Sequence, residues 1–308
     1  MGAQLRQLRQ KIKTVKSTAK ITRAQELIAT SRIVKAQERV KESAPYARHI
    51  TRAVTALISH QTNVAHPLVK EKPDSPRAAV LLITSDRGFC GGYNANVLRE
   101  AEALMTKLRE DGKEPVPYIV GRKGINWYRF RGREVEEEWS GFSDRPNFED
   151  AETIGRRLVA DFLAESEGEG EGKRDLGEIH VIYTQFVSML TQEVQVRRLL
   201  PLEIEEVEAT ATETVPPAYE FEPSAKIALD LMLPNYVESR IWHMLLQAAA
   251  SYHAATRRAM KSATDNANEL VGIYSRQANQ ARQAEITQEI SEIVGGANAL
   301  AEASAGSE

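Results

Sequence analysis

Apolar and small residues recur at alternating spacings of three and four along the first 60 residues. They occupy positions 5, 8, 12, 15, 19, 22, 29, 33, 36 and 40, with a polar interruption at Glu26. Within this segment no glycine follows Gly2, and Pro45 is the only proline. This heptad spacing predicts that residues 1–60 form a coiled-coil helix, roughly 80 Å long at ~1.5 Å per residue.

A second heptad pattern follows Pro234. It runs through positions 242, 245, 249, 252, 256, 260, 263, 267, 270, 274, 277, 281 and 284, with a polar residue at Gln277. We expect a helix over 224–296 that ends at Gly295-Gly296, and a flexible tail over 297–308. Because one compact core cannot stabilise helices this long, we expect the two to pair as an antiparallel coiled coil with both chain ends together.

The region between the helices has the pattern of an α/β domain. We predict strands at 78–85, 117–121, 178–186 and 191–201, and helices at 94–110 and 147–164. Alternation of strands and helices indicates a Rossmann-like, mostly parallel sheet with helices on its faces, here with an antiparallel hairpin at one edge. The fold class is therefore α/β plus a long antiparallel α-helical coiled coil, with the globular domain at 76–222.

Charge is distributed unevenly along the chain. Residues 1–60 hold thirteen basic and three acidic residues, and residues 165–223 hold four basic and fourteen acidic residues. The Glu/Gly segment 165–176 cannot bury apolar surface, so we predict a flexible acidic loop there. We hypothesise that this loop regulates the protein through Glu167, Glu169 and Glu171.

The segment "SDRGFCGGYN" (85–94) raises the possibility of a phosphate site, because it is glycine-rich and follows a predicted strand. A Walker A loop requires Lys and Ser or Thr after its last glycine, but Tyr93 and Asn94 stand there. We therefore interpret the segment as a tight strand-to-helix turn with Asn94 or Asn96 capping the helix. "GRKG" (121–124) is interpreted in the same way.

Catalytic and metal-binding alternatives find little support. Cys90 is the only cysteine, and no histidine can be assigned to it as a base, so we expect a solvent-facing or half-buried structural thiol. His243 and His253 are ten residues apart, do not share a helix face, and are expected on the surface of the coiled coil. We predict no catalytic residue, no cofactor and no metal ion.

The basic first helix is compatible with two kinds of partner. Its seven cations before the first acid could bind nucleic acid phosphates, although the first aromatic residue is Tyr46. The same helix could equally complement acidic protein surfaces. Taken alone, the helix leaves a basic coiled-coil nucleic-acid-binding or scaffold protein as an alternative function.

Several segments together resemble the γ subunit of F-type ATP synthases. They are "KITRAQELIATSRIVKAQ", "SDRGFCGGYN", "YVES" and the long block from Met260 to Leu300, and they span nearly the whole chain. The resemblance implies a non-catalytic central-stalk rotor, present in one copy per complex. It implies that the coiled coil penetrates a hexamer of α and β subunits, while the globular domain stands on the c-subunit ring beside ε and contacts the membrane only through that ring.

The resemblance also implies contact residues. Those expected to face the β subunits are Arg6, Arg9, Lys11, Lys13, Lys16, Lys20, Arg23, Asp86, Arg87, Cys90, Arg282 and Gln283. Phe221 and Glu222 are expected to contact the c ring or ε. Family members often carry methionine where Gln25 and Leu27 stand, so the contact at that height is expected to be more polar here.

The start "MGAQLRQLRQ" enters the predicted helix at once, without a transit segment. Apolar runs are far shorter than a membrane span. We therefore expect a peripheral protein on the cytoplasmic side of a bacterial inner membrane.

Overall fold

A computed structural model describes residues 2–59, 66–70, 72, 75–164, 176–202 and 225–305. The chain divides into two compact units. One unit contains residues 1–28 and 258–308, and the other contains residues 29–257. Both terminal helices contribute residues to both units.

The terminal helices are α1, Gly2–Ser59, and α5, Ala225–Ala305. Each contains one internal proline, Pro45 and Pro234 respectively, at the cost of a single backbone hydrogen bond in a helix of many turns. The expected end at Gly295-Gly296 is wrong, because α5 continues through both glycines. The segment after them, "ANALAEASA", is rich in alanine, the residue with the highest helix propensity.

In the first unit the start of α1 pairs with the last third of α5. The two helices are antiparallel, because Thr22 contacts Thr264 while Lys11 lies 5.7 Å from the ring of Tyr274. On α1 the expected spacing is confirmed, since Leu8 is buried and positions 5, 12, 15, 19 and 22 are partly buried. Glu26 is buried on the same face, where its carboxylate pairs with Arg23 at 2.8 Å.

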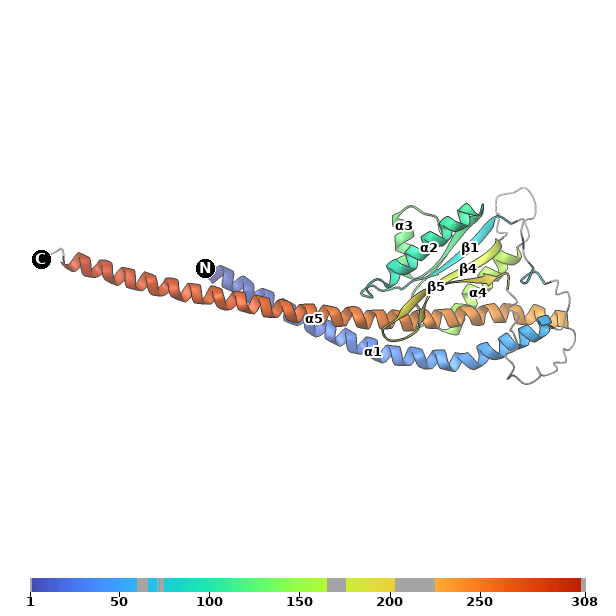
Figure 1. Cartoon of the computed structure of the whole chain (residues 1–308), viewed down its shortest axis with the longest axis horizontal. Helices are drawn as coiled ribbons and strands as arrows, with labels where there is room; N and C mark the ends of the chain where they lie inside the picture. The colour runs from blue at the N-terminus through green and yellow to red at the C-terminus, as the bar shows by residue number, and fades with distance from the viewer. Residues whose placement is uncertain are drawn as a thin grey trace. The chain divides into compact units, whose positions relative to one another are not determined.

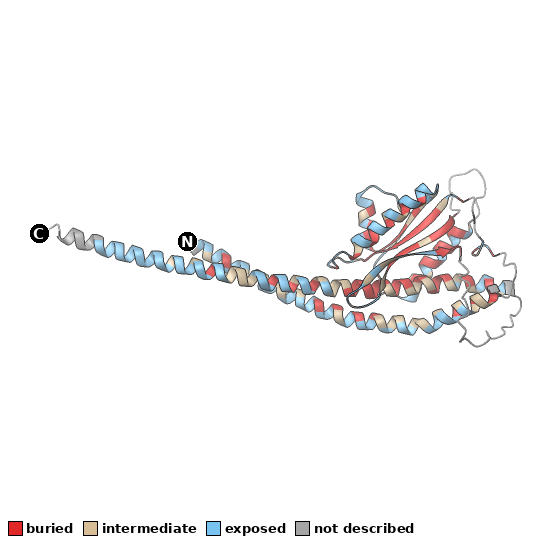
Figure 2. Ribbon diagram, in the orientation of Figure 1, coloured by how far each residue is buried: buried red, intermediate tan, exposed pale blue. Residues whose placement is uncertain are grey.

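The face of α5 that we predicted is confirmed at Leu245, Ala249 and Tyr252 but is wrong at Leu270, Gln277 and Ala284, which are exposed. Met260 and Ala267 are buried as expected, but the buried positions that alternate with them lie one residue later than predicted. Thr264 and Ala278 are buried, whereas Leu270 is 41% exposed and Gln277 is exposed. The coiled-coil face therefore follows spacings of four and then three, and Ala278, not Gln277, stands on it. Figure 2 shows buried and partly buried positions alternating with exposed ones along the paired helices.

The expectation that both chain ends lie together is also wrong. Within this unit α5 continues past the start of α1 (Figure 1). Residues 286–298 are all exposed, including Ile286, Ile290, Ile293 and Val294.

The second unit is built on a five-stranded sheet in the order β3-β2-β1-β4-β5. Its strands are β1 Arg77–Ile83, β2 Glu114–Val120, β3 Glu137–Trp139, β4 Leu176–Phe186 and β5 Gln192–Leu200. The first four are parallel, and β5 pairs antiparallel with β4 at the edge. The predicted fold class is confirmed, including the edge hairpin.

Three further helices belong to this unit. They are α2 Tyr93–Glu110, α3 Arg122–Phe130 and α4 Phe148–Leu163. The helix α3 and the short strand β3 were not predicted. At the start of α4, the backbone N–H of Asn147 donates to the Asp150 carboxylate at 2.7 Å, which satisfies one of the groups a helix end leaves open.

The sheet separates two hydrophobic cores (Figure 1). One face packs against α2 and α3, through residues such as Val97, Ile125 and Ile182. The other packs against α4 and against the parts of α1 and α5 that belong to this unit, through residues such as Leu57, Phe162 and Leu245. The sheet and the adjoining lengths of both long helices therefore share one core.

Candidate functional site

The segment after β1, residues 84–92, is named here the contact turn. The Ser85 backbone N–H donates to the Asn94 side-chain oxygen at 2.9 Å, and Asn94 Nδ2 donates to Ser85 Oγ at 2.8 Å. Asn94 thus closes the turn onto the end of β1. The expectation that Asn94 or Asn96 caps α2 is wrong, because the helix begins after Gly92 with no side-chain cap.

Cys90 lies inside the contact turn and is 3% exposed. Its thiol packs with Tyr93 and Tyr252, and Tyr93 donates its hydroxyl hydrogen to the Ala248 carbonyl at 3.2 Å. Burial raises the pKa of the Cys90 thiol, so the reactive thiolate is disfavoured. The expected exposed or half-buried thiol is therefore corrected to a buried one that fixes the turn to α5.

Asp86 is also turned inward, with a side chain 4% exposed. Its carboxylate accepts backbone hydrogen bonds from Arg122, Gly141 and Ser143 at 3.2, 2.9 and 3.0 Å. Burial would by itself raise the pKa of this carboxyl, but these hydrogen bonds outweigh burial and lower the pKa. Asp86 therefore ties the contact turn to the start of α3 and to the loop at 141–146.

Two residues of the contact turn project from it. The side chain of Arg87 is 68% exposed, and Phe89 is 82% exposed with a backbone φ of 60°. A positive φ is unfavourable for a residue other than glycine, so the surrounding hydrogen bonds hold Phe89 in this conformation. Phe89 was not predicted, although it is the only aromatic residue among residues 84–92.

The predicted basic residues of α1 are all exposed. They are Arg6, Arg9, Lys11, Lys13, Lys16, Lys20 and Arg23. On α5, Arg282 and Gln283 are exposed as well. Phe221, Glu222, Glu167, Glu169 and Glu171 lie outside the described residues.

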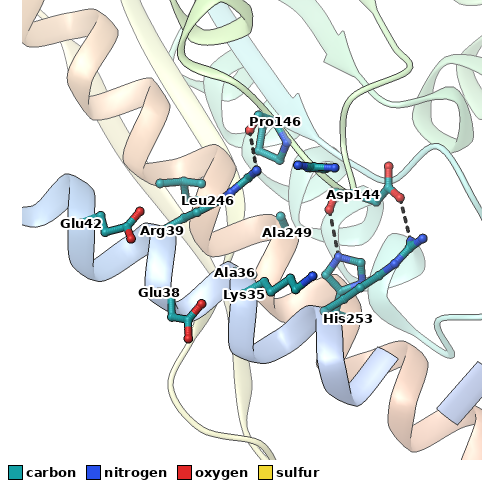
Figure 3. Close-up of a pocket in the computed structure, with 12 residues that line it drawn as sticks. Lys35, Ala36, Glu38, Arg39, Glu42, Asp144, Pro146, Leu246, Ala249 and His253 are labelled. Carbon is teal, nitrogen blue, oxygen red and sulfur yellow. Dashed lines mark hydrogen bonds and ion pairs between the residues drawn. The ribbon is translucent and has the colours of Figure 1, made fainter. Parts of the chain in front are cut away.

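A cavity of about 440 Å³ lies in the second unit, beside α1 and α5 (Figure 3). Leu246 and Ala249 of α5 and Ala36 of α1 line its apolar side. The charged residues around it are Arg32, Lys35, Glu38, Arg39, Glu42, Asp144 and Arg145. Among the described residues, Lys35, Arg39 and Arg145 have no carboxylate partner, and Arg39 donates only to the Pro146 carbonyl at 3.4 Å.

His253 also lines this cavity, and its expected position on the surface is wrong. It is 3% exposed, and its Nε2 lies 2.9 Å from the Asp144 carbonyl oxygen. Burial lowers the pKa of His253, which favours the neutral ring. Since the carbonyl can only accept, the Nε2 nitrogen carries the hydrogen.

Within the described residues, no group of three or more His, Cys, Asp or Glu side chains is arranged to hold a metal ion. None of the helices in that part of the chain combines the length and hydropathy needed to cross a bilayer.

Comparison with known proteins identifies the family. The family model described as ATP synthase matches residues 4–300. The ATP synthase gamma chain of Saccharopolyspora erythraea is 57% identical over 311 residues, which cover 99% of this chain and 100% of the relative. The gamma chain of Kineococcus radiotolerans is 59% identical over 302 residues, covering 98% of each chain.

This chain belongs to the ATP synthase gamma chain family. The predicted role, a non-catalytic rotor subunit of ATP synthase, is confirmed by this membership, and the nucleic-acid-binding alternative is not favoured.

Solved structures agree on the fold of the gamma chain. A chain in the Euglena gracilis mitochondrial ATP synthase, from a structure of OSCP, F1 and c-ring in rotational state 3, has a TM-score of 0.66 at 14% identity and covers 97% of this chain and 95% of its own. A chain in the Tetrahymena thermophila central stalk and c-ring structure has a TM-score of 0.55 at 20% identity. It covers 79% of this chain and 99% of its own.

Proposed function

We propose that this gamma chain is the shaft that couples rotation of a membrane c ring to conformational change in three catalytic β subunits. The surface of the first unit is the observation that most directly supports this role. Its two helices bury only one narrow face against each other and leave seven cations of α1 exposed. A polar, cationic surface suits a shaft, because it can meet successive acidic partners without adhering strongly to one.

The free end of α5 supports insertion into a ring of α and β subunits. Ile286, Ile290, Ile293 and Val294 are between 47% and 71% exposed, beyond the length that α1 covers. Exposed aliphatic side chains spaced in this way fit an apolar sleeve formed by other subunits. We place Arg282 and Gln283 in contact with a β subunit just below that sleeve.

The contact turn is proposed as a second β-subunit contact. Of the three predicted residues there, Arg87 makes the contact, and the exposed ring of Phe89 joins it. Asp86 and Cys90 hold the turn in shape from within. Lys35, Arg39 and Arg145, which lack carboxylate partners in the described chain, extend this cationic surface toward acidic segments of neighbouring subunits.

The remaining partners are assigned by the predicted role. We propose that Phe221 and Glu222 contact the c ring and ε, and that one gamma chain stands in each complex on the cytoplasmic side of the inner membrane.

Glu167, Glu169 and Glu171 are proposed to modulate rotation by meeting cations on a neighbour. Deletion of 166–175 should change ATP hydrolysis or synthesis, and unchanged rates of both would reject that modulation.

The test of the contact turn uses the complete ATP synthase in inverted membrane vesicles. Arg87→Ala and Phe89→Ala should each weaken the contact by about fivefold or more and thereby lower ATP-driven proton pumping per ATP hydrolysed. ATP affinity should not change, because nucleotide binds to the other subunits. Phe130→Ala is the control, since Phe130 is 88% exposed on α3 away from the turn.

Unchanged pumping in both turn variants would reject the contact. Saturable micromolar binding of ATP to the purified gamma chain would reject the claim that it has no nucleotide site.

A further inference from the structure

The loop Gly141–Pro146 contacts three separate parts of the second unit, and Asp144 lies at their meeting point. Its carboxylate Oδ2 is 3.0 Å from Arg32 Nη1 on α1 and 4.0 Å from Arg87 Nη1 in the contact turn. The Asp144 side chain is 17% exposed, so this ion pair is partly shielded from water. One carboxylate therefore links the contact turn to the first long helix.

The backbone of the same residue reaches the other long helix. His253 of α5 donates from Nε2 to the Asp144 carbonyl at 2.9 Å, inside the wall of the cavity (Figure 3). Asp144 thus contacts α1 through its side chain and α5 through its main chain.

The loop is in turn fixed to the contact turn by a reciprocal pair. The Asp86 backbone N–H donates to Ser143 Oγ at 2.7 Å, and the Asp86 carboxylate accepts from the Ser143 N–H at 3.0 Å. Three residues after Ser143, the Pro146 carbonyl accepts from Arg39 of α1. Residues 141–146 therefore form a continuous strap from the contact turn to both helices.

Two further hydrogen bonds join α5 to the sheet and to α2. Tyr93 donates to Ala248, and Ser251 of α5 donates to the Thr184 carbonyl at 3.0 Å. These bonds hold α5 against the sheet whatever the state of the loop. Asp144 differs because it acts on Arg87, α1 and α5 at once.

We propose that Asp144 is a positioning residue for rotary coupling, which fixes the contact turn to α1 and α5 so that a force on Arg87 and Phe89 is transmitted to both helices. The proposal rests on the proposed role of the contact turn. It assigns a mechanical function to the short loop at residues 141–146. Asp144 does not itself need to touch another subunit.

The experiment uses the assembled ATP synthase in inverted vesicles, with Asp144→Asn, Arg32→Gln and the double variant. Asparagine keeps the size and the main-chain carbonyl of Asp144 but removes the charge that holds Arg32 and Arg87. Loss of a partly shielded ion pair shifts the equilibrium that holds the turn by about threefold to fivefold, so each single variant should lower the number of protons pumped per ATP. The double variant should be no worse than Asp144→Asn alone, because that substitution already removes the pair with Arg32.

A matched control is Glu138→Gln. Its partner Arg129 is also 3.0 Å away, but this pair joins α3 to β3 and touches neither long helix. Glu138→Gln should leave the ratio of protons to ATP unchanged. The rate of ATP hydrolysis and the temperature of inactivation, measured on all variants, show whether the complex is intact.

The outcomes separate the two proposals. An unchanged pumping ratio in Asp144→Asn, with a lowered ratio in Arg87→Ala, would overturn the role of Asp144 and leave the contact turn in place. An unchanged ratio in both would overturn the contact turn itself. A lowered ratio in Glu138→Gln, or additive losses in the double variant, would show a general effect on folding and would also overturn the role of Asp144.

Discussion

The hydroxyls of Thr22 and Thr264 lie 2.7 Å apart on the face where α1 and α5 pair. Each hydroxyl also has a carbonyl acceptor on its own helix, Met260 for Thr264 at 2.9 Å and Ala19 for Thr22 at 3.1 Å, so either threonine can donate across the pair. A hydrogen bond at a position that apolar residues usually occupy is directional, and it therefore favours one register of the two helices.

Replacing one threonine should be worse than replacing both. Thr22→Val or Thr264→Val should each destabilise the helix pair by about 1 kcal/mol, because one hydroxyl loses its partner. The double variant should recover part of this loss. Urea unfolding followed by circular dichroism gives the coupling free energy, and strictly additive losses would contradict a direct interaction.

Gly121 should not tolerate alanine. Its φ is 97°, and an added Cβ would lie 2.5 Å from the Thr84 carbonyl oxygen. Gly121→Ala should therefore cost about 3 kcal/mol or more, from backbone strain and a clash with backbone atoms. The control is Gly112→Ala, which has a φ of 77° but no atom within 4 Å of the added Cβ, and should cost about 1 kcal/mol. Equal midpoints in thermal unfolding would show that the clash is relieved.

Protonation of His253 should destabilise the second unit in mild acid. Burial lowers the pKa of the folded imidazole below its ordinary value of 6.5, so the unfolded chain binds the proton first as pH falls. The contribution of His253 is thus fully present above pH 6.5 and is lost progressively below it. His253→Gln should flatten the fall in melting temperature between pH 7.5 and 5.5, and His243→Gln tests the second histidine whose pKa burial lowers. An unchanged pH dependence in His253→Gln would contradict this prediction.

Glu178 should stabilise the sheet at neutral pH. The His180 imidazole, 3.1 Å away, and the Lys113 ammonium, 2.9 Å away, lower the pKa of Glu178 to about 2. Its ordinary value is 4.5, so the stabilisation is present above pH 4.5 and is lost as pH falls toward 2. Glu178→Gln should cost about 1 to 2 kcal/mol at pH 7, allowing for solvent around Lys113. The urea midpoints of the wild-type chain and of Glu178→Gln should lie closer together at pH 3 than at pH 7. A difference between them that does not change with pH would contradict the assignment.

The sequence was a good guide wherever burial alone decides a side chain's place. The heptad spacing of α1 is one example, because only one face of that pattern could be buried. The apolar run of β1 is another, because a short continuous apolar run predicts a strand buried on both faces. On α5 the same reasoning failed between Met260 and Ala281. Small residues stand on several faces there, so spacings of three and four fit equally well, and contact with the partner helix decides between them. The short helix α3 was missed because Gly124 weakens its helix propensity, and it is the contact with Thr84 that requires this glycine.

The contact turn shows what local sequence cannot supply. The pattern around Gly88, Gly91 and Gly92 indicated a turn, and the turn is present. The inward direction of Asp86 depends on Gly141 and Ser143, more than 50 residues later in the chain. Such long-range hydrogen bonds leave no local periodicity, and for the same reason Asp144 and His253 could not be paired from sequence.

The strand order has a consequence for how this fold is used. The crossovers from β1 lead to β2 on one side, whereas β4 is added on the other, so the direction of winding reverses between β1 and β4. In open α/β sheets, the crevice beyond the carboxyl ends of strands at such a switch point is where ligands bind. Here Cys90, Tyr93 and Asn94 fill that crevice with the chain's own side chains. The position that receives a ligand in other open α/β sheets is occupied here by packed side chains, which join the contact turn to α5.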